Sequence, residues 1–92
     1  MRGKSVRMTV IFSGHVQGVG FRYQTLKCSQ QFDVVGHVRN LADGTVELVA
    51  QGDRAVVENF LQAVEQRMAG NVKDRMVTWA GTVAELTEFE IQ

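Results

Sequence analysis

The sequence lacks the residues that would cross-link it. Its 92 residues include one cysteine, Cys28, so a disulfide within the chain and a cysteine-based metal cluster are both excluded. A single thiol is typical of proteins in reducing compartments. Long apolar runs are also lacking: residues 10–12 form the longest one near the start, far too short for a signal-peptide core or a membrane span. We therefore expect a cytoplasmic protein with no membrane partner.

An excess of charge of one sign is also missing. The ten basic and ten acidic residues cancel to a net charge of +0. A protein that binds nucleic acid through its overall charge carries a strong positive excess, so no nucleic-acid partner is expected. Any bound anion must be held by a local arrangement of groups. A chain of this length forms one hydrophobic core, and we expect a single domain over residues 1–92 that works as a monomer.

Hydrophobic periodicity predicts the order of the elements. Alternating apolar residues at positions 6–12 predict a strand. Apolar residues three or four positions apart predict a helix from Phe21 to Phe32 and a second one between Asp53, as its N-cap, and Gly70. The other expected strands cover residues 34–41, residues 45–51, part of 72–83, and 88–91, with a tight turn at 42–44. This order predicts an α+β fold of the ferredoxin-like, split βαβ type, an antiparallel sheet with two helices on one face.

A glycine-rich stretch, GHVQGVGFR at residues 14–22, joins the first strand to the first helix. The N–H groups at a helix start lack partners, and the helix dipole adds partial positive charge, so this position suits an anion. Gly14, Gly18 and Gly20 allow several N–H groups to turn towards one point, and Arg22 adds a cationic fork for phosphate oxygens. The stretch is neither a Walker loop nor a dinucleotide fingerprint. On composition alone, a turn that only changes the chain direction remains an alternative.

Two segments of this sequence are more specific than its composition. Residues 16–22, VQGVGFR, resemble the signature loop of the acylphosphatase family. Residues 36–47, GHVRNLADGTVE, resemble the second signature of that family, in the right order and at the expected separation. The resemblance extends over both predicted helices to residues 89–91, and so over nearly the whole chain. Two departures lie outside the signatures: residues 30–33 replace the usual Leu-Gly pair after the first helix, and the tail is short.

The resemblance implies an enzyme that hydrolyses the carboxyl–phosphate bond of acyl phosphates without a metal or another cofactor. By matching position, Arg22 is the phosphate-binding arginine and Asn40 the water-positioning asparagine. Gly14 and Gly18 match glycines that shape the loop, and inorganic phosphate or sulfate should compete with the substrate. The resemblance assigns the phosphoryl oxygens to the backbone N–H groups of Gln17, Gly18, Val19, Gly20, Phe21 and Arg22.

This small set of groups agrees with the chemistry. The leaving carboxylate has a conjugate acid with a pKa of about 4 to 5, near that of Asp and Glu, so it departs without a general acid. A loose phosphoryl-transfer transition state asks little of a base. Charge stabilisation and alignment of water remain. The lack of a histidine–carboxylate pair or a metal cluster is therefore expected.

Other polar and aromatic residues have simpler interpretations. The two histidines, His15 and His37, show no metal-ligand spacing and are expected to be structural or exposed to solvent. We expect Arg7 and Arg39 to lie on a solvated face of the sheet. Cys28, Trp79 and Phe89 are expected to be packed against other residues.

Several alternatives remain open. The fold hosts many functions, and a non-enzymatic module that binds RNA or a protein is one of them. RNA-binding modules of this topology expose aromatic residues on the central strands, whereas residues 45–51 contain none. An acylphosphatase-like regulatory domain of a larger enzyme is another alternative, which the short length disfavours. Asn40 could also serve only as a polar residue that stabilises the hairpin.

Overall fold

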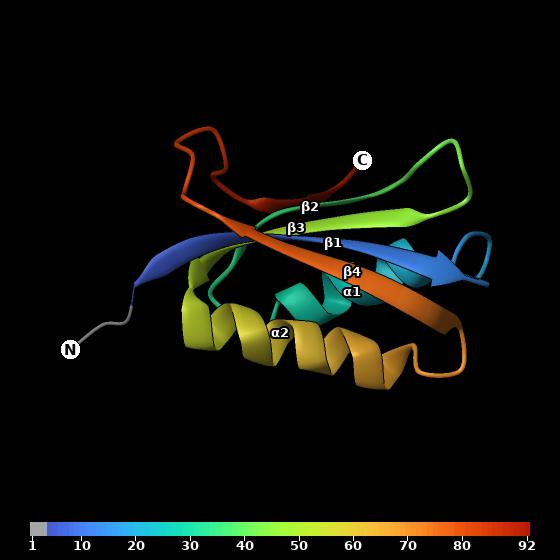
Figure 1. The fold of residues 1–92 in the computed structure, drawn as a ribbon. Coiled ribbons are helices and arrows are strands. Elements are labelled where there is room, and N and C mark those ends of the chain that lie inside the picture. Colours follow the sequence, from blue (N-terminus) through green and yellow to red (C-terminus); the bar gives the residue numbers. More distant parts are fainter. Residues whose placement is uncertain (1–3) are drawn as a thin grey trace.

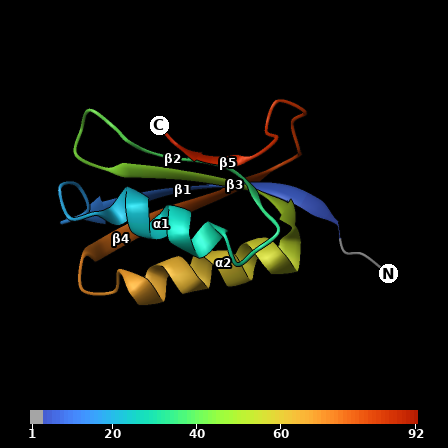
Figure 2. The same ribbon diagram turned by 180° about the vertical axis from the view of Figure 1, so that it is seen from behind.

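The computed structural model describes residues 4–92 of the chain. Its five strands form one sheet in the order β4-β1-β3-β2-β5, and both helices cover the same face of that sheet (Figure 1, Figure 2). The predicted ferredoxin-like α+β fold is thus confirmed. The elements in chain order are β1 Ser5–Gly14, α1 Phe21–Ser29, β2 Val35–Asn40, β3 Val46–Asp53, α2 Arg54–Arg67, β4 Val72–Ala80 and β5 Phe89–Ile91.

The sheet is mixed rather than wholly antiparallel. The pairs β1–β3, β1–β4 and β2–β3 are antiparallel, as predicted, but β5 runs parallel to β2, with Val38 opposite Ile91. The direction of β4 explains this difference. Because β4 runs opposite to β1 and β2, the chain reversal after β4 sends β5 along β2 in the same direction. The N–H groups of Gly36 and Gln92 donate to Glu88 and Val38, respectively, and hold the pair together.

The core lies between the sheet and the two helices. Alternate residues of β1 supply Met8, Val10 and Phe12, each fully buried, as their spacing predicted. The α2 face that packs on them is centred on Phe60. The centroid of the Phe60 ring lies 5.6 Å from that of Phe89. Cys28 is buried on α1, which confirms its expected place in the core.

The two helices differ in how well their ends were predicted. Helix α2 starts where expected, because the Asp53 carboxylate accepts the Ala55 N–H at 3.0 Å as an N-cap. Helix α1 ends at Ser29, before the predicted Phe32. The N–H groups of Gln31 and Phe32 donate to carbonyls three residues back, which tightens the last turn and ends the helix. Within residues 4–92, neither helix has the length and apolar character that crossing a membrane requires.

Strand direction brings two distant segments together. Both β1 and β2 pair antiparallel with β3, so they run in the same direction and end at the same edge of the sheet. The β1–α1 loop and the β2–β3 hairpin therefore leave the sheet side by side, at the right of Figure 1 and the left of Figure 2. These segments carry the two sequence signatures.

Candidate active site

The β1–α1 loop begins at a glycine that no other residue can replace without strain. Strand β1 breaks its register with β4 between Ser13 and Gly14, and Gly14 has a φ of 121°. A Cβ at this position would lie 2.6 Å from both the carbonyl oxygen of Asn71 and the nitrogen of Lys73. The His15 N–H donates to the same Asn71 oxygen at 2.9 Å. The loop is therefore fixed to the start of β4.

Apolar side chains hold the rest of the loop against the core. Val16 is 1% exposed, and the centroid of the Phe21 ring lies 5.0 Å from that of the Phe12 ring. Helix α1 begins after Gly20, which is left-handed at a φ of 79° and provides no side-chain cap. Within residues 4–92, no N–H group of the segment 17–22 donates a backbone hydrogen bond. This uncapped start leaves donors available to an anion.

A cleft of about 220 Å³ lies at this helix start. Arg22 and Asn40 both line it, although 18 positions separate them in the sequence, and Gly18 and Gly20 contribute backbone. The structure thus brings together both predicted catalytic side chains and two of the loop glycines. Two residues of the predicted phosphate-binding segment 17–22 do not line the cleft: Val19 packs against the core, and the Gln17 side chain turns to the β2–β3 hairpin. Gly14, at the start of the loop, does not line it either.

The guanidinium of Arg22 is held by one hydrogen bond and has no acidic side chain beside it. Its Nη1 donates a hydrogen bond to the main-chain oxygen of Gln92 at 3.1 Å. No Asp or Glu side chain of residues 4–92 forms an ion pair with Arg22, and the first turn of α1 contains no acidic residue. The acidic side chains of residues 4–92 therefore leave the positive charge of Arg22 at the helix start unpaired.

Asn40 ends β2, directly before the hairpin. Gly44 in the predicted turn is left-handed, with a φ of 90°. The Asp43 carboxylate accepts the Thr45 hydroxyl at 2.6 Å and the Thr45 N–H at 3.0 Å. These two hydrogen bonds, the one from the hydroxyl first, lower the pKa of Asp43. The turn that follows Asn40 is therefore internally braced, and Asn40 itself is exposed at the cleft.

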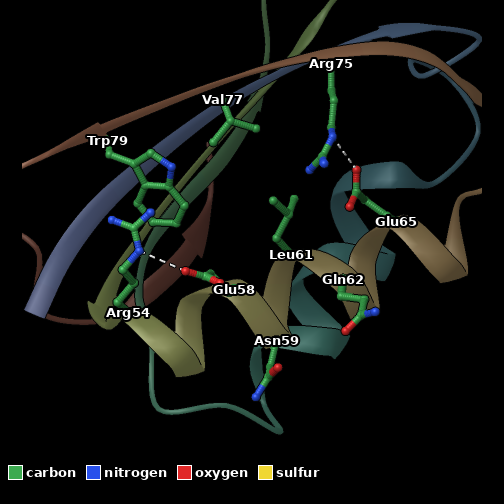
Figure 3. A pocket seen from close by; sticks show the side chains of 9 residues that line it. All are labelled: Arg54, Glu58, Asn59, Leu61, Gln62, Glu65, Arg75, Val77 and Trp79. Atoms are coloured by element: carbon green, nitrogen blue, oxygen red, sulfur yellow. Dashed lines mark hydrogen bonds and ion pairs between the residues drawn. The ribbon is translucent and has the colours of Figure 1, made fainter. Parts of the chain in front are cut away.

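A larger groove of about 520 Å³ lies between α2 and β4 (Figure 3). It contains two arginines, but each is paired: Arg54 with Glu58 at 2.8 Å and Arg75 with Glu65 at 2.9 Å. Arg54 also stacks over the Trp79 ring, 4.2 Å from its centroid. No residue predicted for the phosphate site lines this groove. Its size therefore does not make it the better candidate.

Comparison with known proteins agrees with the two signatures. The acylphosphatase family model matches residues 8–91. The chain is 38% identical to an acylphosphatase of Thermobifida fusca, over 95% of this chain and 97% of that protein. It is 37% identical to an acylphosphatase of Paenarthrobacter aurescens, over 99% and 98%. The chain belongs to the acylphosphatase family.

A solved acylphosphatase has the same fold. The crystal structure of acylphosphatase from Bacillus subtilis matches this chain with a TM-score of 0.83 and 30% identity, over 95% of this chain and 98% of that one. Family and fold together support an enzyme that hydrolyses acyl phosphates, with a small-molecule phosphate as its substrate.

The cleft of this acylphosphatase contains three residues that were not predicted as site residues, among them the buried Val16. Tyr23 and Ile91 both line it. Tyr23 follows Arg22 in the first turn of α1 and is 56% exposed, and a solvent-facing aromatic residue beside the signature loop was a usable signal. Ile91 reaches the cleft through the parallel pairing of β5 with β2. Nothing in the local sequence indicates that pairing.

The outer face of the acylphosphatase sheet carries a separate ionic cluster. Glu47 accepts from Nε of Arg39 at 2.7 Å, and its Oε1 lies 3.1 Å from Nε2 of His37. Burial raises the pKa of Glu47, but the hydrogen bonds from His37 and Arg39 outweigh that effect and lower it. Arg39 is exposed, as expected, whereas Arg7 is half-buried with its Nε screened from solvent. In the described part of the chain, no three His, Cys, Asp or Glu residues are placed to hold a metal ion.

Proposed function

We propose that this chain hydrolyses acyl phosphates by attack of water on phosphorus. In this proposal, Arg22 and the N–H groups of residues 17–22 bind the phosphoryl oxygens, and Asn40 orients the water. The observation that carries it is the cleft, where Arg22 and Asn40 flank an uncapped helix start with unpaired donors. The family match supplies the substrate class.

The step needs only groups that this cleft offers. The water oxygen forms a bond to phosphorus while the bond from phosphorus to the carboxylate oxygen breaks, and the carboxylate leaves with the electron pair. The protons of the water pass to the phosphate product and the solvent. Negative charge on the phosphoryl oxygens is stabilised by Arg22 and the amides, which are already in place before the reaction. No titrating side chain is required at the reacting atoms.

The side-chain amide of Asn40 suits the attacking water better than a charged group would. Its carbonyl oxygen accepts a hydrogen bond from the water and its NH₂ group donates one. A carboxylate at the same place would repel the phosphoryl group. Asn40 also lies at the end of a paired strand, opposite Val46, and this position restricts the direction of attack.

An acyl phosphate and an aryl phosphate test the proposal directly. We expect the purified chain to hydrolyse benzoyl phosphate rapidly and phenyl phosphate hardly at all. Both present a phosphoryl group, but phenol has a pKa of about 10, as in tyrosine, against about 4 to 5 for a carboxylic acid, and the proposed mechanism assigns no residue to protonate the leaving group. Equal rates on both compounds, or no hydrolysis of benzoyl phosphate above the blank, would contradict the proposal.

The proposed reaction uses no metal, because Arg22 and the amides supply the positive charge. Dialysis against a strong chelator is expected to leave the rate on benzoyl phosphate unchanged. A loss of activity that added Mg²⁺ or Zn²⁺ restores would refute this part of the proposal.

A further inference from the structure

The side-chain amide of Gln17 connects two separate segments of the chain through hydrogen bonds. Although Gln17 belongs to the signature loop, its half-buried side chain reaches the β2–β3 hairpin. Its Nε2 donates one hydrogen bond to the carbonyl oxygen of Leu41 and another to that of Thr45, both at 2.8 Å. These two carbonyls flank the turn that directly follows Asn40. One side-chain NH₂ group thus joins the loop that carries the amides to the hairpin that carries Asn40.

The sheet alone connects these two segments only indirectly. Strand β3 lies between β1 and β2, and neighbouring strands are about 4.8 Å apart, so the ends of β1 and β2 are separated by roughly twice that distance. The loop and the hairpin extend beyond the paired part of the sheet. Hydrogen bonds made directly between the loop and the hairpin fix the distance between them more tightly than the pairing of β1 and β2 with β3 does.

The hairpin does not need Gln17 to satisfy its own hydrogen bonds. The Leu41 oxygen already accepts the Gly44 N–H at 3.2 Å, and the Thr45 oxygen accepts the Leu41 N–H at 2.9 Å. Loss of the Gln17 amide would leave neither carbonyl without a partner, and the heavy penalty for an unsatisfied buried group would not arise. The two bonds therefore contribute relative position more than they contribute stability.

We propose that Gln17 is a positioning residue that sets the distance between the phosphate loop and Asn40. This inference rests on the proposed function, because it matters only if the loop holds the phosphate and Asn40 holds the water. An error of about 1 Å in such an arrangement can cost on the order of 10²-fold in rate. The family match does not assign this task to the Gln17 side chain.

The variant Gln17→Met removes both hydrogen bonds and keeps the length of the side chain. We expect kcat on benzoyl phosphate to fall roughly 10- to 100-fold, with the inhibition constant of inorganic phosphate nearly unchanged. Arg22 and the loop amides remain in this variant, so ground-state binding of phosphate should persist. A role in stability alone would instead lower the Tm and leave kcat per folded molecule intact.

Gln51 provides a matched control on the other face of the sheet. It is also half-buried, and its amide also makes two hydrogen bonds, one to the Val83 oxygen at 2.9 Å and one from the Val83 N–H at 2.8 Å. Gln51→Met should lower the Tm at least as much as Gln17→Met, because Val83 loses both partners. Its kcat should stay at the wild-type value.

A double-mutant cycle with Asn40→Ala decides the question. If Gln17 acts by placing Asn40, Gln17→Met should cost little further rate once Asn40 is gone. A full multiplicative loss in the double variant, or a wild-type kcat in Gln17→Met, would overturn the inference and leave the proposed function standing. A wild-type kcat in Asn40→Ala would overturn the role of Asn40 and the Gln17 inference together, and the single variants distinguish these cases.

Discussion

The cleft at α1 and the groove between α2 and β4 invite comparison, because each places arginine beside a concave surface. The groove is the larger, at about 520 Å³ against 220 Å³, and has two arginines. Both are paired with glutamates, whereas Arg22 donates to a main-chain oxygen of Gln92 and pairs with no Asp or Glu side chain of residues 4–92. The cleft also borders a helix start without a cap. Unpaired donors, and neither volume nor the number of arginines, distinguish a site for an anion.

The largest expected effect comes from replacing one arginine in each of the two regions. Arg22→Ala should lower kcat on benzoyl phosphate by roughly 10³ to 10⁵ and weaken inhibition by inorganic phosphate, since arginines at a transferring phosphoryl group contribute on that scale. Arg54→Ala in the groove should leave both values unchanged. Arg22→Lys should restore little, because a point charge does not reproduce the guanidinium fork. Steady-state kinetics on the three variants would contradict the comparison if Arg22→Ala and Arg54→Ala behaved alike.

The next effect compares two asparagines. Asn40→Ala should lower kcat by on the order of 10² to 10³, the cost of removing one preorganised polar group, while phosphate inhibition stays near normal. Asn59→Ala, in the groove, should change neither. The alternative role of Asn40 in the hairpin makes a different prediction, namely a lower Tm with kcat per folded molecule preserved. Measuring Tm, inhibition and kcat on each sample separates the two roles of Asn40.

Inorganic phosphate itself should distinguish the regions without any mutation. In an NMR titration, we expect the amide signals of residues 14–22 to move and saturate, because the N–H groups of residues 17–22 in this loop surround the expected position of the anion. Signals from Arg54, Trp79 and the other residues of the groove should stay in place. Shifts confined to the groove would reverse the assignment of the site.

The smallest effect concerns a third arginine, Arg39, which is paired with Glu47 on the outer face. The lowered pKa of Glu47 means that its ionised form stabilises the fold at neutral pH. This stabilisation should fade as the pH falls from about 5 through the ordinary glutamate value of about 4.3 and below. We therefore expect the Tm difference between the wild type and Glu47→Gln to shrink over that range. Equal differences at neutral and acid pH would exclude the linkage, and kcat at neutral pH should not change.

The sequence predicts those parts of the fold that local patterns determine. Alternation around Val10 gave the buried face of β1, and Asp53 gave the start of α2. The direction of β5 depends on the path of the chain around the sheet edge, to which no local pattern refers. The end of α1 at Ser29 also escaped prediction, because Phe32 has helical spacing yet reaches the core from a tightened turn.

The candidate site divides in a similar way. Motif matching located Arg22 and Asn40, and the structure places both at one cleft. The motif match did not indicate that the Gln17 side chain would turn from the cleft to the hairpin. Its hydrogen bonds there join residues 24 and 28 positions away in the sequence. Hydrogen bonds of this kind depend on strand order and register, which become visible only after folding.

Because the start of α1 has no side-chain cap, the stability of the enzyme should depend on whether an anion is bound there. A side-chain cap at a helix start is worth about 1 kcal/mol relative to alanine. Gly20 offers none, so a bound phosphoryl group is expected to take over that task. Folding and ligand binding then become linked equilibria, and an anion at one hundred times its Kd would add about 2.7 kcal/mol to the free energy of unfolding. Such a protein should melt at a higher temperature in phosphate buffer than in an amine buffer of the same pH and ionic strength.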